Sequence, residues 1–345
     1  MSMSLCKIGE GSYGKVYKYS NEDAVKVCKF DYCKEYGVSI NIASWMELYV
    51  LDKCKNNPYI INIKNSFIRD DFFNCITVEY AHFGNVTLKS LSSIFKKKKC
   101  IYSAASAVSF LHSLNIMYRD VTLLNILDFG NDIYKLCDMG MCGYDQNPNV
   151  CSLWWRAPEL LDIIPVYNHK IDCWSIGVLM HDIWTERFTF ECDNEYELKK
   201  KISLFKNKIV DEPVSSFINS LIKINPNDRY ELCEILKNKW WEISHFECKN
   251  DKINSNKINN KKISQIYAIL LQYSFFKPDT IIKNDVFIFL INKFYHHIDN
   301  NDDIVALYVI WCKIYCGKVI LKNKIKNVEY IMMKEKKIYN AYLLT

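Results

Sequence analysis

Glycine is scarce in this chain. Ten of its 345 residues are glycine, about 3% where proteins average about 7%. Three of the ten nevertheless lie close together, at Gly9, Gly11 and Gly14. Glycine tolerates unusual backbone angles and lets the backbone approach a ligand closely. This short segment is therefore the first candidate for a binding function.

Long apolar runs and closely paired cysteines are also missing. No stretch approaches the roughly 18 to 20 apolar residues that cross a bilayer, and the opening MSMSLCKIGEG lacks the apolar core of a signal peptide. The 15 cysteines include no C-x-x-C pair, which argues against a zinc module and a secreted disulfide scaffold. We expect reduced cysteines in the cytoplasm or nucleus, or in a host cell if the source is a virus.

Charge is balanced rather than extreme. The formal net charge is +6, half of the residues are hydrophobic and 24% are charged. That composition is typical of a folded globular protein and excludes a disordered chain. A mild positive balance does not indicate nucleic-acid binding, so we expect neither a nucleic acid nor a membrane as partner.

The chain divides into a mixed first part and a helical remainder. Residues 245–262 are polar, rich in Asn and Lys and without periodicity, as in a linker. Helical periodicity precedes the linker and returns after it, in residues 263–345. We expect strands at Leu5–Ile8, Lys15–Tyr19, Ala24–Cys28 and Ile76–Tyr80, a helix at Ile40–Cys54, and apolar helical stripes at Ile101/Ala104/Ala105/Val108/Leu111, Ile171/Trp174/Val178/Leu179 and Ile304/Leu307/Tyr308/Trp311.

The glycine cluster has the pattern G-x-G-x-x-G-x-V, from Gly9 to Val16. In a dinucleotide fingerprint this pattern opens a helix, whereas here a strand-like run follows. The segment is therefore interpreted as a hairpin flap whose backbone N–H groups approach phosphates. Lys26, on the next strand, is placed to neutralise those phosphates, and Glu47 in the following helix to hold Lys26 by an ion pair. Taken singly, either charge is better interpreted as an ordinary surface residue.

An ordered series of downstream motifs accompanies the flap. The series is Tyr118-Arg119-Asp120 with Asn125, then Asp138-Met139-Gly140, Ala157-Pro158-Glu159, Asp172-x-Trp174 and Arg229. In this order and spacing, the motifs resemble the protein kinase family over residues 5 to about 242. The resemblance implies an α+β two-lobed kinase fold with a small β-rich lobe and a large helical lobe.

The resemblance also implies roles for individual residues. Asp120 would accept or orient the proton of the substrate hydroxyl, and Asn125 and Asp138 would ligate Mg²⁺. Glu159 and Arg229 would form an ion pair that braces the large lobe. The ATP-binding set comprises Ile8, Gly9, Glu10, Gly11, Ser12, Tyr13, Gly14, Lys15 and Val16 of the flap, Lys26, and the hinge residues Glu79 and Ala81, beside a gatekeeper Val78.

A literal D-F-G string lies elsewhere, at Asp128-Phe129-Gly130. It follows Asn125 too closely to return the chain to the metal, and Gly130-Asn131-Asp132 is a hairpin-turn signal. We therefore expect the metal-binding acid to be Asp138, reached after a return strand at Ile133–Cys137.

Two strings point to a subfamily. Ile8–Lys18 (IGEGSYGKVYK) and Ser152–Leu161 (SLWWRAPELL) resemble segments of cyclin-dependent kinases. The second differs from the corresponding segment of tyrosine kinases, which favours serine/threonine substrates. Arg156 matches the arginine that shapes the pocket for a following proline in that subfamily, which implies Ser/Thr-Pro substrates.

Two departures from the family pattern bear on activity. Thr122 replaces the lysine that serine/threonine kinases place near the γ-phosphate. Asn147 stands at the usual phosphothreonine position, while Met46 and Gly143 replace two of the three arginines that would receive its phosphate. Only Arg119 remains of that receptor. We therefore expect activity without phosphorylation of the activation segment, which in the kinase resemblance runs from Asp138 to Glu159.

The helical remainder resembles a cyclin box in three segments. These are Ala268–Tyr273, Trp311–Lys313 and Glu335–Leu344, and Lys313 and Glu335 match the two residues with which cyclins grip the kinase helix. Trp45, in the helix of Glu47, would be the apolar anchor of that contact. A generic helical bundle remains the alternative, because each match is degenerate.

The resulting interpretation has three parts: a protein kinase domain at 5–244, a linker at 245–262 and an all-α cyclin-box-like domain at 263–345. The expected function is an ATP- and Mg²⁺-dependent serine/threonine kinase of cyclin-dependent type, activated in cis by its own cyclin-like domain. Two alternatives stay open: a kinase-fold pseudoenzyme acting as a scaffold, and an active kinase whose helical domain docks substrates.

Overall fold

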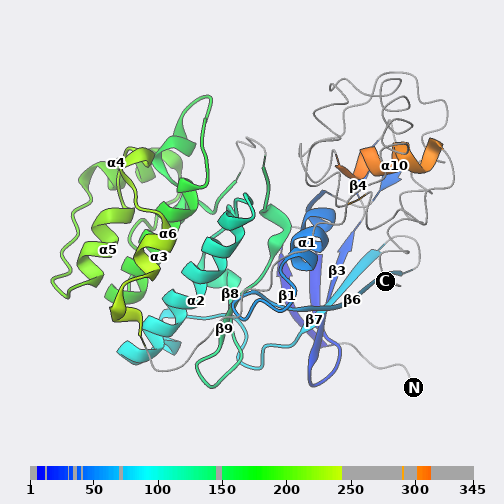
Figure 1. Cartoon of the computed structure of the whole chain (residues 1–345), viewed down its shortest axis with the longest axis horizontal. Coiled ribbons are helices and arrows are strands. Elements are labelled where there is room, and N and C mark those ends of the chain that lie inside the picture. The colour runs from blue at the N-terminus through cyan, green and yellow to red at the C-terminus, as the bar shows by residue number, and fades with distance from the viewer. Residues whose placement is uncertain are drawn as a thin grey trace. The chain divides into compact units, whose positions relative to one another are not determined.

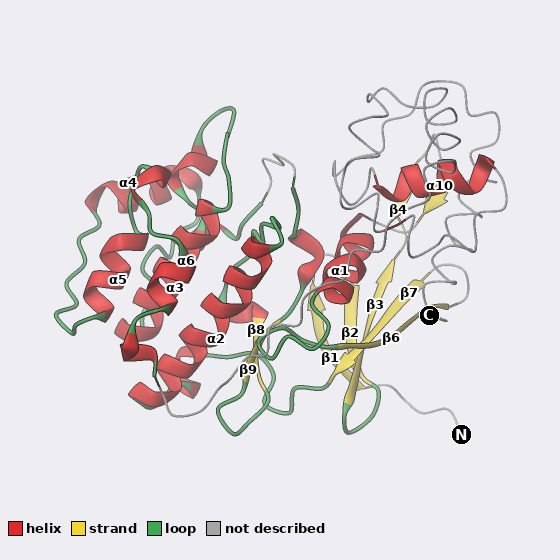
Figure 2. Cartoon of the chain, viewed as in Figure 1, coloured by secondary structure: helices red, strands yellow, loops and turns green. Residues whose placement is uncertain are grey.

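The computed structural model describes residues 6–11, 14–29, 31–33, 37–39, 42–69, 73–144, 150–242, 290 and 301–311. The chain forms two compact units (Figures 1 and 2). One comprises Met1–Asp52, Ile63–Glu79 and Lys249–Thr345, and the other comprises Lys53–Asn62 and Tyr80–Cys248. The predicted linker and most of the predicted C-terminal helices, with Lys313 and Glu335, lie outside the described residues.

A five-stranded antiparallel sheet dominates the first unit (Figure 2). Its strand order is β1-β2-β3-β7-β6. The predicted runs correspond to four of these strands, whereas β6 was not predicted because Lys64, Asn65 and Ser66 interrupt its apolar pattern. The bounds are β1 Cys6–Gly11, β2 Gly14–Lys18, β3 Asp23–Lys29, β6 Ile63–Arg69 and β7 Phe73–Glu79, with a separate ribbon of β4 Asp31–Cys33 and β5 Gly37–Ser39.

The glycine segment forms the β1–β2 hairpin, as the sequence predicts. Gly11 pairs with Gly14 at its closed end. A Cβ atom on Gly14 would lie 2.5 Å from the Val27 carbonyl oxygen of β3. Glycine is therefore required at position 14 by the close approach of two strands.

Helix α1, Ile42–Lys53, is the predicted first helix. Residues 43–51 are all buried, including Trp45 and Met46, which are 1% and 2% exposed. Glu47 is also buried, at 5% exposed. A buried acid requires a charged or hydrogen-bonding partner, which directs attention to the residue that Glu47 contacts.

The second unit is mainly helical (Figure 1). The predicted stripes of α2 and α3 are buried throughout. On α3, a Cβ atom added to Gly177 would lie 2.8 Å from Cβ of Leu221 in α5, so a glycine lets these helices pack closely. The helices are α2 Ile94–Ser113, α3 Lys170–Thr185, α4 Glu195–Leu204, α5 Val214–Leu221 and α6 Leu232–Leu236, and a small hairpin is formed by β8 Ile126–Asp128 and β9 Tyr134–Leu136.

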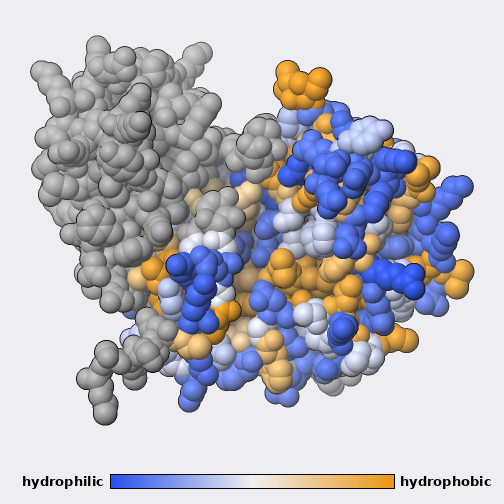
Figure 3. Space-filling model, turned by 180° about the vertical axis from the view of Figure 1, so that it is seen from behind, coloured by the Kyte–Doolittle hydropathy of each residue, from blue (hydrophilic) through white to orange (hydrophobic). Residues whose placement is uncertain are grey.

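Apolar side chains also reach the surface of the second unit. Ile163, Ile164 and Val166, which follow the short helix η5 (Pro158–Leu161), are all more than three-quarters exposed. On the face drawn in Figure 3, apolar residues are interspersed with hydrophilic ones. None of the described helices is long and apolar enough to span a bilayer.

Helix α10, Asn301–Trp311, is the described helix of the C-terminal region. The predicted stripe of Ile304, Leu307, Tyr308 and Trp311 is buried, as expected. Val305, Ala306, Val309 and Ile310 are buried as well, so α10 is enclosed on all sides rather than along one face. A helix that is apolar all round belongs in a core.

Candidate active site

Lys26 and Glu47 form an ion pair in the first unit. The Lys26 Nζ lies 2.8 Å from Glu47 Oε2, and the two side chains are 12% and 7% exposed. Lys26 lies in the middle of the sheet, paired with Val16 of β2 and Ile76 of β7. The structure thus contains the Lys26–Glu47 ion pair that the sequence predicts.

The flap residues lie on β1 and β2, before Lys26 in the chain. Ile8 is 44% exposed, and Glu10 forms ion pairs with Lys7 and Lys15. Ser12 and Tyr13, at the predicted tip, lie outside the described residues. The expected hinge begins where β7 ends at Glu79, and Ala81 and the gatekeeper Val78 are both buried.

In the second unit, Asp120 and Asn125 contact each other directly. The Asn125 side-chain amide donates to the Asp120 backbone carbonyl at 2.8 Å and to Oδ2 of its carboxylate at 2.7 Å. Ser152 Oγ donates to the other carboxylate oxygen at 2.8 Å. Burial raises the pKa of Asp120, although these hydrogen bonds oppose the shift. A raised pKa makes the carboxylate a stronger proton acceptor.

Asp138 lies where the chain leaves β9, in a left-handed conformation with φ of 53°. Its Oδ1 accepts from the Gly140 N–H at 3.3 Å. Tyr118 Oη donates to the adjacent Cys137 carbonyl at 2.6 Å, which ties the Asp138 segment to the loop of Asp120.

The literal D-F-G string forms the β8–β9 turn, as predicted. Asp128 Oδ1 accepts from the Gly130 N–H at 2.8 Å. Gly130, Asn131 and Asp132 all have positive φ, which is typical of a tight hairpin. Asp128 thus serves its own turn.

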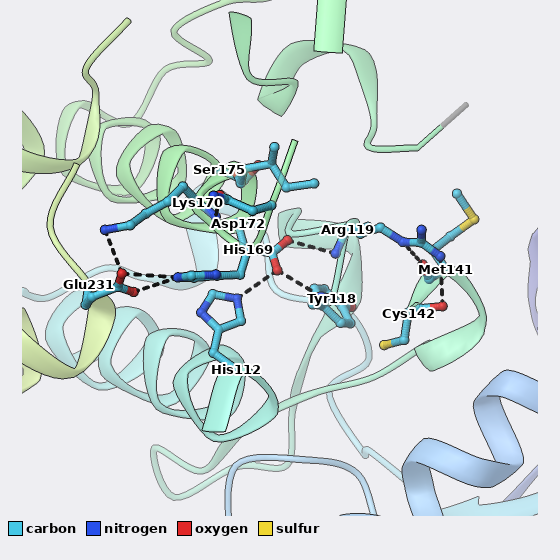
Figure 4. Close-up of polar contacts among 12 residues, drawn as sticks. His112, Tyr118, Arg119, Met141, Cys142, His169, Lys170, Asp172, Ser175 and Glu231 are labelled. Carbon is cyan, nitrogen blue, oxygen red and sulfur yellow. Dashed lines mark hydrogen bonds and ion pairs between the residues drawn. The ribbon is translucent and has the colours of Figure 1, made fainter. Parts of the chain in front are cut away.

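Asp172 holds the backbone of the proposed catalytic loop, residues 118–125 (Figure 4). Its fully buried carboxylate accepts from the N–H groups of Tyr118 and Arg119, both at 2.8 Å, and lies 2.9 Å from His112 Nε2. Arg119 has a φ of 68°, which is unusual for a residue with a side chain. The two hydrogen bonds hold this strained backbone directly before Asp120.

The Arg119 guanidinium contacts the activation segment. Nε donates to the Met141 carbonyl at 2.6 Å and Nη2 to the Cys142 carbonyl at 2.9 Å. Arg119 is only 5% exposed. The neighbouring backbone is also paired, because Met117 and Gly143 exchange two hydrogen bonds of 3.1 and 3.0 Å. The segment that follows Asp138 is therefore anchored to the catalytic loop.

Glu159 and Arg229 form the ion pair that the sequence predicts. It is bidentate, with both N–O distances 2.7 Å. The Arg229 side chain is fully buried, and its guanidinium lies over the Trp174 ring, 5.1 Å from the ring centroid. Bidentate geometry and full burial make this a structural pair rather than a surface contact.

Sequence reasoning missed some contacts around these residues. Neither the Ser152–Asp120 hydrogen bond nor the His112–Asp172 contact was predicted. No local sequence pattern indicates these contacts, because Ser152 and Asp120 are 32 positions apart in the sequence and His112 and Asp172 are 60 apart. Among the residues that depart from the family pattern, Asn147 lies outside the described residues. Thr122 is buried, with 2% of its surface exposed.

Comparison with known proteins gives one family. A family model described as "Protein kinase domain" matches residues 3–241, more than half of the chain. Serine/threonine-protein kinase kin-29 of Caenorhabditis elegans is 27% identical over 72% of this chain and 33% of its own length. The Aurora kinase of Saccharomyces cerevisiae is 26% identical over 68% and 67%, and cyclin-dependent kinase G1 of Arabidopsis thaliana 27% over 70% and 42%. The chain thus spans between a third and two thirds of these relatives.

Proposed function

Because the chain belongs to the protein kinase family and its kinase domain is of the serine/threonine type, we propose that it transfers the γ-phosphate of ATP to serine or threonine hydroxyls of proteins. The observation that carries this proposal is the Lys26–Glu47 ion pair of 2.8 Å. Without that pair a kinase cannot position the phosphates for transfer. Phosphorylation of a Ser/Thr peptide array by the full chain with Mg²⁺-ATP tests the proposal.

Asp120 is the proposed acceptor or orienting group for the substrate hydroxyl proton. Its carboxylate is oriented by Asn125 on one oxygen and Ser152 on the other. Its raised pKa brings it closer to the pH at which the enzyme works. During transfer the hydroxyl proton would pass to this carboxylate while the hydroxyl oxygen bonds to the γ-phosphorus. The bond from that phosphorus to the bridging oxygen would break, and ADP would leave.

Asn125 and Asp138 are the proposed Mg²⁺ ligands. Asn125 uses its amide nitrogen on Asp120, which leaves its side-chain oxygen for a metal. Asp138 supplies carboxylate oxygen, so the donor set is the hard-oxygen type that Mg²⁺ prefers. A bound Mg²⁺ would neutralise charge on the ATP phosphates.

The cyclin-dependent type and a preference for Ser/Thr-Pro substrates are proposed from the sequence of the segment around Arg156. The Arg156 guanidinium donates to the Glu195 carboxylate at 2.7 Å and to the Cys151 carbonyl at 3.0 Å. These bonds support a fixed orientation at the position that the subfamily uses to accept proline. Arrays that pair each Ser-Pro peptide with a Ser-Ala peptide test the preference.

Activity without activation-segment phosphorylation is proposed from Arg119. This arginine, which in related kinases would bind the phosphate, is engaged by the carbonyls of Met141 and Cys142. Gly143 and the buried Met46 supply no further cation. The backbone carbonyls thus accept N–H groups that a phosphate would otherwise bind. Phosphatase treatment of the full chain should leave its rate unchanged, and a large loss would contradict this part.

Activation in cis by a cyclin-like C-terminal domain rests on the sequence resemblance of residues 263–345. A flexible chain as long as the predicted linker would have a reach of roughly 20 Å, so contact within one chain is feasible. Replacing Lys313 or Glu335 by alanine in the full chain should lower turnover, whereas Lys336→Ala should not. Unchanged turnover in both variants would favour a helical domain with another role.

A kinase-fold scaffold remains the second candidate because Thr122 replaces a phosphate-binding lysine. Threonine carries no charge, so position 122 supplies no cation to a nucleotide phosphate, and the residue is buried. Mg²⁺-dependent ATP turnover by the full chain separates the two functions: a scaffold would bind partners without it.

A further inference from the structure

Side chains of types that ligate metals lie close together in the second unit. His112 lies in the last turn of α2, His169 and Cys173 at the start of α3, and Glu231 directly before α6. One ligand atom each of His112, Cys173 and Glu231 lies within 4.8 Å of the other two. Figure 4 shows both imidazoles beside the Glu231 carboxylate.

His169 lies against Glu231, beside this group of three. Its Nε2 lies 3.0 and 3.1 Å from the two carboxylate oxygens of Glu231, and its ring centroid is 5.0 Å from that of His112. His169 and Cys173 are four residues apart in helical backbone, so they share a face of α3. In this arrangement a ring proton bridges His169 and Glu231, and a cation could take its place.

The orientation of His112 is set by a carboxylate behind it. His112 Nε2 lies 2.9 Å from Asp172 Oδ2, and Asp172 is fully buried and already accepts two backbone N–H groups. An acceptor with those contacts favours the tautomer that carries its proton on Nε2. Nδ1 then has a free lone pair. A carboxylate that orients a histidine in this way is the usual support of a protein metal ligand.

We propose that His112, His169, Cys173 and Glu231 form a binding site for a divalent transition-metal cation, with Zn²⁺ the best match. Two imidazole nitrogens, a thiolate and a carboxylate form a four-coordinate donor set that Zn²⁺ prefers. Mg²⁺ and Ca²⁺ take oxygen ligands, so this site differs in chemistry from the one proposed at Asn125 and Asp138. Zinc binding would form the Zn–S bond and release the Cys173 thiol proton to solvent.

The charges around the group are compatible with this cation. A Cys173 thiolate and the Glu231 carboxylate together balance a 2+ charge. Lys170 Nζ lies 2.7 Å from Glu231 Oε1, and His169 Nε2 lies within 3.1 Å of both oxygens of that carboxylate. Bound metal would join the end of α2 to the start of α3, next to the Asp172 that holds the catalytic loop.

Cobalt provides the direct test, because Co²⁺ bound by a thiolate in tetrahedral geometry gives a charge-transfer band and visible d–d bands. We expect the metal-free full chain to develop these bands when titrated with Co²⁺ and to lose them when Zn²⁺ is added. Cys173→Ser should abolish the charge-transfer band and weaken Zn²⁺ binding by about 100-fold, and His169→Ala should weaken it by at least about tenfold.

Cys233→Ser is the matched control, because Cys233 is exposed and lies two residues from Glu231. It should leave the bands intact. His169→Ala guards against a folding defect in Cys173→Ser, because the His169 side chain is 39% exposed and its loss should spare the fold. The proposal is overturned if the full chain gives no thiolate–cobalt band, or if folded His169→Ala binds Zn²⁺ as tightly as the full chain does.

Discussion

Ser152 Oγ donates a 2.8 Å hydrogen bond to Oδ1 of Asp120, and the Ser152 N–H lies 3.3 Å from the same oxygen. The activation segment therefore contacts the proposed catalytic carboxylate directly. Asn125 holds the other oxygen at 2.7 Å. The orientation and basicity of Asp120 thus depend on a residue 32 positions away in sequence.

Ser152→Ala should shift the acid limb of kcat/KM to higher pH. Burial raises the pKa of Asp120 and the Ser152 hydroxyl lowers it, so removing the hydroxyl should raise the pKa further. A hydrogen bond to a charged group corresponds to about one pH unit. The pH–rate profile measures the shift.

Ser203→Ala provides the comparison, because the exposed Ser203 hydroxyl donates to Lys200 and not to an acid. Its profile should match that of the unmodified chain. An acid limb that stays in place in Ser152→Ala would mean that Asp120 is not the group that titrates.

Asp138→Asn should abolish Mg²⁺-dependent turnover, whereas Asp128→Asn should preserve it. Asp138 follows the return strand β9, while Asp128 accepts from Gly130 within the β8–β9 turn. Titrating Mg²⁺ at saturating ATP distinguishes the two variants. Equal losses in both would show that the turn residue takes part in metal binding.

Glu159→Gln should destabilise the second unit by about 3 kcal/mol, because it leaves the fully buried Arg229 guanidinium without its carboxylate. Glu195→Gln removes the partner of the more exposed Arg156 and should cost about 1 kcal/mol or less. Urea unfolding measures both free energies. Similar losses would mean that burial does not distinguish the pairs.

Stability should depend on pH through Asp182. Burial raises its pKa to about 7, although Thr189 and Trp155 donate to its carboxylate and oppose the shift. An acid whose pKa is raised by folding stabilises the fold while protonated, so its contribution is present at low pH and lost as the pH rises through about 7.

Asp182→Asn should therefore remove a fall in stability between about pH 4 and about pH 7. Urea midpoints of the unmodified chain and the variant, measured across that range, reveal it as a changing difference. The exposed Asp193→Asn serves as control. A difference that stays constant with pH would rule out a titrating Asp182.

The sequence predicted features that depend on local spacing. Helix α1 was expected at Ile40–Cys54 and lies at Ile42–Lys53, because its apolar residues set the period. The turn after β8 followed from Gly130-Asn131-Asp132, whose positive φ angles need such residues. The order of the kinase motifs supplied the long-range pairs Lys26–Glu47 and Glu159–Arg229.

Contacts without a motif could not be predicted in this way. Asp120 acquires Ser152, and Asp172 acquires His112, only when distant segments fold together. The absence of C-x-x-C pairs argued against a zinc module, yet folding brings Cys173 to His112 and Glu231. Spacing along the sequence can indicate metal ligands that lie on one segment. It cannot indicate side chains that three distant segments bring together on folding.

The most direct measurement is transfer of labelled phosphate from Mg²⁺-ATP to a Ser/Thr peptide by the full chain and by its Asp120→Asn variant. The asparagine side chain keeps the shape of the Asp120 side chain but cannot accept the proton of the substrate hydroxyl. We predict transfer by the unmodified chain and a loss of roughly 10²–10⁴-fold in the variant. Absence of transfer by the unmodified chain, or equal rates in the two proteins, would contradict the proposed kinase mechanism.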